Sequence, residues 1–318
     1  MSGKSFQISL IRQGANVWNS WREEFPTLSV DLSGSVFSGL DLTGIDFSNA
    51  LLKNSNFSRC NLKEANFSDS DISNCNFSEA NLSSANLEKV KSSESDFSSC
   101  NLTGSKLSEG EISNCTFRRS VLTKSTGTKC QFDQSDFTRS VLRNCNFSNS
   151  SFVKVIGIKT NWSNSQLENC NFTAADLRNS KLIGVDLDNS LLVGANLESC
   201  KLRESSAVGS DFSSCKGSSI DLREGNFQNS NFSNAILEFG DFFDSNFNLA
   251  NFSSANLSSA FMDNGNFYKA NFSRANLAFA NLDDADLELA NLEGANMKDS
   301  SRNRTIVSQE SLAKAILA

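Results

Sequence analysis

Apolar residues recur at every fifth position from Leu32 to Met297, without one insertion or deletion. They form 54 successive centres, and 49 of these are Leu, Phe, Ile, Met or Trp. The exceptions are Ser92, Gly127, Gly157, Ala207 and Gly217. An amphipathic helix repeats about every 3.6 residues and a half-buried strand every two, so neither keeps one face apolar at this period. The pattern predicts a solenoid, in which each unit buries its apolar side by stacking on its neighbours.

The positions around each centre are also selective. The residue two before the centre is small, the residue just before it is mostly Asn or Asp, and the residue after it is often Ser or Thr, as in Ala65-Asn66-Phe67-Ser68-Asp69. Small residues imply a tight inward slot. Asn and Asp favour turns because their side chains bond to nearby backbone. Each unit therefore has one small and one large inward residue, separated by polar residues.

Units such as Ala195-Asn196-Leu197-Glu198-Ser199 resemble the A(D/N)LXX units of the pentapeptide-repeat family. The resemblance covers about 85% of the chain, from Val30 to Asp299. It implies an all-β solenoid, a right-handed quadrilateral β-helix in which four pentapeptides make one square coil. At the spacing of neighbouring strands, about 4.8 Å, the units would make about 13.5 coils and a rod of roughly 65 Å.

We expect three parts in the chain: an N-terminal helical cap over residues 1–29, the β-helix over 30–299, and a C-terminal segment with a short helix over 300–318. A solenoid end exposes an apolar cross-section and open strand edges, so a cap is required at each end.

Residues 5–25 have helix-like spacing, with Leu10, Val17 and Phe25 expected on the same broad face as Trp18 and Trp21. The GxxxWNxWR segment that begins at Gly14 is similar to the leader before many bacterial, notably cyanobacterial, pentapeptide arrays. We interpret the two tryptophans as cap residues over the first coil, with stacking on a ligand as the alternative.

At the other end, Ser308 is expected to begin a short helix over residues 309–318, with Leu312 and Ile316 on its apolar side. Ten residues are marginal as a free helix. The segment from Gln309 to Ala318 must therefore dock, either on its own last coil or on a second subunit to give a homodimer.

All nine cysteines fall in the small inward slot, which predicts buried, reduced space-fillers. Their reduced state fits a cytoplasmic location. Neither a signal peptide nor a membrane span is expected from the apolar runs. The chain has no histidine, so the usual zinc sites and His-dependent triads are not predicted, and no P-loop occurs. We expect no enzyme activity, no metal and no cofactor.

Two groups of outward residues depart from the polar pattern. Arg119, Arg139 and Lys159 are 20 residues apart, so in a four-sided coil they would form one vertical basic row. The row is interpreted either as a grip on an anionic partner or as a solvated edge.

The second group is aromatic. Of 26 phenylalanines, 20 occupy centres, and four of the other six lie between residues 239 and 279. These four are expected to cluster on one edge: Phe239, Phe243, Phe261 and Phe279. Grouped exposed aromatics are typical interface anchors. The alternative is a set of isolated, tolerated surface residues.

These features support two hypotheses about function. The first is a non-catalytic, cytoplasmic interaction scaffold, a rigid rod that presents a binding edge to a protein partner. The second follows from the resemblance, since quinolone-resistance members of the family mimic DNA and bind the topoisomerase DNA gyrase. A mimic needs a long negative surface. The net charge of −7 fits this, whereas residues 101–200, with 11 basic and 9 acidic groups, argue against it. Direct nucleic-acid binding is disfavoured by the pI of about 4.9.

Overall fold

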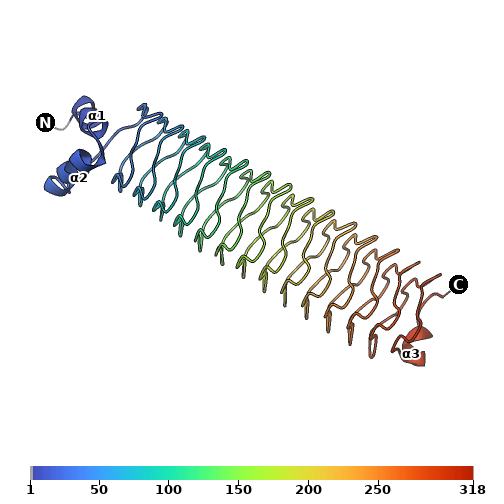
Figure 1. Ribbon diagram of the computed structural model, residues 1–318. Coiled ribbons are helices and arrows are strands. Elements are labelled where there is room, and N and C mark those ends of the chain that lie inside the picture. Colours follow the sequence, from blue (N-terminus) through green and yellow to red (C-terminus); the bar gives the residue numbers. More distant parts are fainter. Residues whose placement is uncertain (1–2, 318) are drawn as a thin grey trace. The chain divides into compact units, whose positions relative to one another are not determined.

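The computed structural model describes residues 3–317 and divides into two compact units, Met1–Ile156 and Gly157–Ala318. The first unit begins with two helices, α1 (Lys4–Arg12) and α2 (Ala15–Glu24), and the second ends with α3 (Gln309–Leu312) (Figure 1). The rest of each unit consists of stacked coils.

Within each unit, parallel β-bridges join successive coils, and the bridged residues are 20 positions apart. Asp31 pairs with Leu51 in the first unit, and Asn161 pairs with Lys181 in the second. Backbone hydrogen bonds also join successive coils, as the Leu32 N–H donates to the Leu51 carbonyl oxygen at 2.8 Å. One turn follows each pentapeptide, so a coil of 20 residues has four sides and four corners.

The turn explains the polar positions of the repeat. Asn56 Oδ1 accepts a hydrogen bond from the Ser58 N–H at 2.9 Å, and the next residue, Arg59, has a φ of 58°. Between coils, asparagines also bond to one another, as Asn251 Nδ2 donates to Asn231 Oδ1 at 3.0 Å. The left-handed conformation is costly for β-branched residues, and Val, Ile and Thr do not occur among the positive-φ residues of the described chain.

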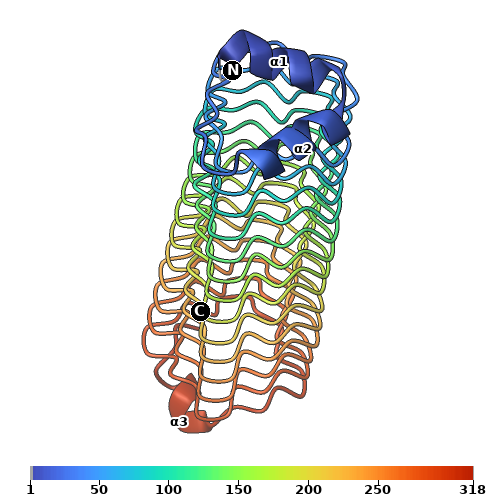
Figure 2. The same cartoon turned by 90° about the vertical axis from the view of Figure 1, so that its left-hand side faces the viewer.

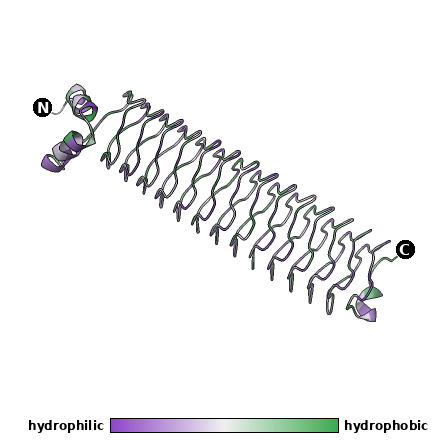
Figure 3. Ribbon diagram, viewed as in Figure 1, coloured by the Kyte–Doolittle hydropathy of each residue, from purple (hydrophilic) through white to green (hydrophobic). Residues whose placement is uncertain are grey.

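The core of each unit is built from the repeat centres, which stack on the centres 20 residues away. Phe57 and Phe77 stack with ring centroids 5.0 Å apart in the first unit, and Phe252 and Phe272 do so at the same distance in the second. The centres are almost completely buried, and along each coil hydrophobic and hydrophilic positions alternate (Figure 3).

Neighbouring side chains fill the space at the glycine centres. A Cβ atom added to Gly127 would lie 2.6 Å from the Phe147 ring, and one added to Gly217 would lie 3.0 Å from Leu237 Cδ2. In both cases the residue one coil further on occupies the volume that a large centre would have taken. The gaps in the sequence pattern therefore do not become holes in the core at these two positions.

All nine cysteines are buried. Several of the thiols donate to backbone carbonyls of the preceding coil, as Cys60 Sγ does to the Phe37 oxygen at 2.9 Å. Burial raises the pKa of Cys100 to about 12 and that of Cys115 to about 11. These thiols are protonated at neutral pH and have little nucleophilic character.

The N-terminal segment forms two separate helices. The sequence had predicted helical spacing with one broad apolar face over residues 5–25. Gly14, with a φ of 116°, separates α1 from α2, so the helical spacing does not continue across it. As a result, Val17 and Phe25 are each 39% exposed, whereas Trp18 and Trp21 are buried.

The helices α1 and α2 lie at the start of the coils of their unit (Figure 2). The two tryptophans of α2 are buried. Trp18 Nε1 donates to the Asp46 carbonyl at 2.6 Å, and the Trp18 ring lies 5.9 Å from that of Phe47. Arg22 adds a bond from its guanidinium to the Ser48 carbonyl at 2.7 Å. The helices therefore supply apolar cover and hydrogen-bond donors to the first coils.

The C-terminal helix is shorter than expected, because α3 ends at Leu312. The chain then returns to the coil pattern: Ile316 pairs with Asn296, and its N–H donates to the Ala295 carbonyl at 2.8 Å. Strand pairing of Ile316 competes with helix here, so the expectation of a helix over residues 309–318 was wrong beyond Leu312. Leu312 is half-buried and Ile316 is 53% exposed. Ala318 lies outside the described residues.

Candidate functional site

The exposed apolar residues of the coils fall into two classes. Most occupy the position just before a centre, where the backbone is extended and forms a bridge, as at Leu191 and Ile236. Large apolar residues are favoured on such a pleated surface, so these positions have a structural explanation. The second class occupies outward turn positions, where no such preference applies. It includes Phe239 and Phe279, both in the second unit.

Phe239 and Phe279 occupy the same corner of the coil, two coils apart. Their φ angles are 57° and 61°, and their side chains are 58% and 62% exposed. Ser259 occupies this corner in the coil between them. Exposure and a left-handed backbone both disfavour a large apolar residue, so folding alone does not account for these two phenylalanines.

The other two phenylalanines lie on the adjoining side of the coil. Phe261 follows Ala260 directly after the Ser259 corner, is 52% exposed, and forms bridges with Asp241 and Asn281. Phe243 lies further along that side and is 36% exposed. We call the set of Phe239, Phe243, Phe261 and Phe279 the aromatic corner. The coil register brings Phe239, Phe261 and Phe279 around one edge and places Phe243 beside them.

Carboxylates surround the aromatic corner. Arg223 Nε lies 2.9 Å from Asp221 Oδ1 and 3.2 Å from Asp241 Oδ2, so one guanidinium holds two carboxylates of successive coils. Burial raises the pKa of Asp241, and the neighbouring carboxylates of Asp221 and Asp263 add to the rise, whereas Arg223 opposes it. Asp244 is exposed on the same side. The surface is apolar at its centre and acidic at its rim.

This arrangement is suited to binding. Aromatic side chains at the centre of a patch exclude water and supply contact area, while rim charges select the partner's charge. Within residues 3–317, no group of three or more His, Cys, Asp or Glu residues is placed to hold a metal ion.

Only two of the three residues of the predicted basic row lie in the same unit. Arg119 and Arg139 occupy the same corner of successive coils in the first unit, with φ angles of 59° and 62°, and both are exposed. Next to them, Arg118 Nε lies 2.6 Å from Asp136 Oδ2. Lys159 has the same φ, but it belongs to the second unit. The structure therefore brings together two of the three predicted residues.

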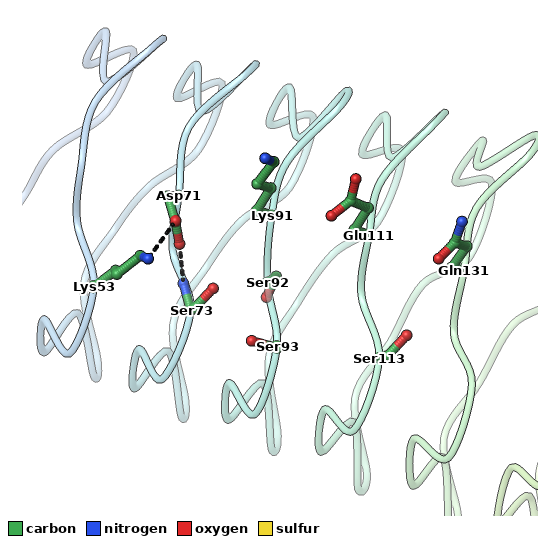
Figure 4. Close-up of a pocket in the computed structure, with 9 residues that line it drawn as sticks. All are labelled: Lys53, Asp71, Ser73, Lys91, Ser92, Ser93, Glu111, Ser113 and Gln131. Atoms are coloured by element: carbon green, nitrogen blue, oxygen red, sulfur yellow. Dashed lines mark hydrogen bonds and ion pairs between the residues drawn. The ribbon is translucent and has the colours of Figure 1, made fainter.

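Ser92 lies at a pocket of about 400 Å³ in the first unit (Figure 4). The sequence marked Ser92 only as a defective centre. Lys53 reaches across to the next coil, where its Nζ lies 3.0 Å from Asp71 Oδ2, and Lys91 and Glu111 occupy successive coils beside it. Small side chains form the floor, with Ser73, Ser92, Ser93 and Ser113 all lining the pocket. The lining is polar and carries both signs of charge, so it favours neither an anion nor a cation.

Two further residues were missed by the sequence analysis. Leu249 and Leu289 have φ angles of 62° and 58° and are 50% and 57% exposed. They are thus the aliphatic counterparts of Phe239 and Phe279. A search of the outward turn positions for any large apolar residue, rather than for Phe alone, would have found them.

Family models match most of the chain. The model described as "Pentapeptide repeat region" matches residues 28–87 and 53–127. The model described as "Pentapeptide repeats (8 copies)" matches residues 130–156, 158–189, 180–216, 250–288 and 270–301. A comparison with curated proteins gave no match.

Several solved structures are similar to the chain. Trypsin-treated QnrB1, a plasmid-mediated fluoroquinolone resistance protein, is 16% identical over 62% of this chain and 89% of its own, with a TM-score of 0.33. HetL, involved in heterocyst differentiation regulation in the cyanobacterium Nostoc, is 22% identical over 84% of this chain and 89% of its own, with a TM-score of 0.20. Rfr23 from the cyanobacterium Cyanothece is 18% identical over 45% of this chain and 91% of its own, with a TM-score of 0.16.

In the part of the chain that the structure covers, no helix has the length and apolar character needed to cross a membrane.

Proposed function

Because this chain belongs to the pentapeptide-repeat family, we propose that it is a non-catalytic scaffold that binds a protein partner in the bacterial cytoplasm through its aromatic corner. The repeat supplies a fixed backbone frame, and the side chains at its outward positions supply the specificity. The acidic rim favours a partner that presents basic residues around an apolar centre.

One observation carries the proposal: Phe239 and Phe279 are large, exposed and held in a left-handed turn. Burial of an aromatic side chain contributes roughly 1.5–3 kcal/mol. Contact with a partner would recover this free energy, which the chain by itself leaves unused. Aromatic anchors inside a polar rim are the usual centre of a protein interface.

Binding to DNA gyrase by mimicry of DNA is the alternative. It requires a continuous negative surface. The exposed Arg119 and Arg139 interrupt such a surface in the first unit. This alternative therefore has weaker support and becomes one outcome of the test below.

The test is a pull-down from cytoplasmic extract with the wild-type chain and with a Phe239→Ser/Phe261→Ser variant, read by mass spectrometry. The matched control is Leu191→Ser/Ile306→Ser, which removes two exposed apolar residues of the same unit from outside the corner. We expect a partner that the wild type and the control retain and that the Phe239→Ser/Phe261→Ser variant loses at least tenfold.

Equal retention by all three proteins would show that the aromatic corner is not the site. A topoisomerase subunit in the eluate, together with inhibition or protection in a gyrase supercoiling assay, would favour the alternative instead.

A further inference from the structure

The second unit has an apolar corner opposite the aromatic one. Leu249 and Leu289 lie ten residues after Phe239 and Phe279, which is half of a 20-residue coil. In a four-sided coil, corners that are half a coil apart lie diagonally across from each other. We call Leu249 and Leu289 the leucine corner.

The two corners have the same spacing. Each pair is separated by 40 residues, or two coils, which is about 9.6 Å along the stack. The residue between the pair is Ser259 at the aromatic corner and Lys269 at the leucine corner. A pair at one corner can therefore meet a pair at the other in register when two molecules lie side by side.

The spacing coincides with a similarity between two segments 40 residues apart. Residues 237–251 and 277–291 share Leu, Phe, Asp, Leu, Ala and Asn at the first, third, eighth, thirteenth, fourteenth and fifteenth positions. Each copy thus provides one phenylalanine at one corner and one leucine at the other. No other outward left-handed position of the described residues carries Phe, Leu, Ile, Val, Met, Trp or Tyr.

The two corners differ in charge. Contact between two aromatic corners would bring the carboxylates of Asp244 and Asp263 against the same groups of the other copy, whereas Asp241 is paired with Arg223. The leucine corner carries Lys269 and, one coil further on, the exposed Glu288 beside Leu289, so contact between two leucine corners brings together both signs of charge. The mixed contact instead brings Lys269 to the acidic rim. Lys269 is exposed, and its Nζ lies 5.0 Å from the centroid of the Tyr268 ring. Opposite charges at a contact favour the mixed arrangement.

We infer that the aromatic corner of one molecule packs against the leucine corner of a second copy of this chain. The inference rests on the proposed function, since it names a second copy as an occupant of the same aromatic corner. The contact is heterologous, so each molecule keeps one unused corner and further copies add side by side.

The area at one corner is small. A stable interface buries roughly 1,600 Å² in total, and contacts below about 1,200 Å² are typical of weak, transient complexes. We therefore expect association at protein concentrations of about 10–100 µM rather than at nanomolar concentration.

Sedimentation equilibrium of the full chain tests this directly. We expect the weight-average mass of the wild type to rise above that of a monomer with concentration, without a plateau at the dimer. The Phe239→Ser/Phe279→Ser variant and the Leu249→Ser/Leu289→Ser variant should each remain monomeric. An equimolar mixture of the two variants should form a dimer and stop there, because each variant retains the corner that the other lacks.

Charge reversal gives a second test that leaves the apolar corners unchanged. Lys269→Glu should weaken association at least tenfold, and Lys269→Glu/Asp263→Lys should restore most of it. Circular dichroism and thermal melting would confirm that each variant is folded. If a serine variant does not fold, the charge variants test the inference in its place.

A wild type that is monomeric up to 200 µM would overturn the inference. So would a plateau at the dimer that only the phenylalanine substitutions abolish, since that result requires aromatic corners to meet each other. A monomeric wild type whose partner in the pull-down is still lost with Phe239→Ser/Phe261→Ser would leave the proposed function standing, so the two failures are distinguishable.

Discussion

One corner position of the coil carries arginines in the first unit and, besides Lys159, phenylalanines in the second. Arg119 and Arg139 occupy it in the first unit, with φ angles of 59° and 62°, and Phe239 and Phe279 occupy it in the second, with 57° and 61°. All four side chains are exposed. The backbone is therefore the same whether the residue is cationic or aromatic. Hydrogen bonds between coils fix the backbone, and the outward side chain can vary without changing it.

The largest effect is expected at an inward position of the same unit. Phe252 stacks between Phe232 and Phe272, at centroid distances of 5.2 and 5.0 Å, and is fully buried. Phe252→Ala should lower the free energy of unfolding by about 3–5 kcal/mol, because a cavity remains where the ring was. Chemical denaturation measures the change. The outward control Phe279→Ala should alter it by less than about 1 kcal/mol, and similar losses for both variants would contradict the distinction between frame and surface.

A smaller effect of opposite sign is expected at the aromatic corner. Phe279→Asn should raise the free energy of unfolding by about 1 kcal/mol, since Asn tolerates the left-handed conformation better than Phe. Thermal melting should show this as an increase of about 2–4 °C. The matched control is Phe261→Asn, whose backbone is extended and bridged, so it should bring no gain. A loss of stability for Phe279→Asn would show that the ring packs favourably within its own molecule.

The next effect depends on pH. Burial raises the pKa of Asp186 from 3.8 to about 6, and the neighbouring carboxylates of Glu168 and Asp188 add to the rise. The folded state therefore favours the protonated acid, so the destabilisation by Asp186 grows as pH rises from about 4 to about 6 and is complete above that range. Asp186→Asn, which keeps an acceptor for the Asp188 N–H, should stabilise the chain at pH 7 by about 0.5–1 kcal/mol after allowance for solvent screening.

Melting curves of Asp186→Asn and wild type across this pH range provide the measurement, and the gain should vanish near pH 4. Glu168→Gln should give a similar gain, and combining both substitutions should add little, because the two carboxyls act as a pair. A gain that does not vary with pH would show that Asp186 acts through packing instead.

The smallest effect on stability is expected from exchanging the two chemistries. Phe239→Arg/Phe279→Arg should change the free energy of unfolding by less than about 0.5 kcal/mol, as is usual for surface positions. The same variant should lose the partner of the aromatic corner and the side-by-side association. Denaturation and sedimentation on one preparation would test both statements. A large loss of stability would mean that this corner position does not accept arginine in the second unit as it does in the first.

The terminal segments show where sequence reasoning was incomplete. Trp18 and Trp21 are buried against the coil end of their unit, but the break at Gly14 and the return of Ile316 to strand pairing were not predicted. Both depend on which backbone groups of the coils remain available, and a local pattern does not contain that information. The leucine corner, by contrast, was open to prediction, since Leu249 and Leu289 break the polar pattern as plainly as the phenylalanines do.

The sequence by itself determined the period, the inward residues and the outward positions that carry unusual side chains. It could do so because each pentapeptide repeats the same local requirement: a small residue, a turn-forming residue and a large one. The tertiary structure decided how gaps in that pattern are treated. At Gly127 a neighbouring ring fills the space, whereas at Ser92 the buried hydroxyl lies 3.6 Å from the Cys115 thiol. The reason is that packing depends on the residue one coil away, 20 positions distant in sequence and directly adjacent in space.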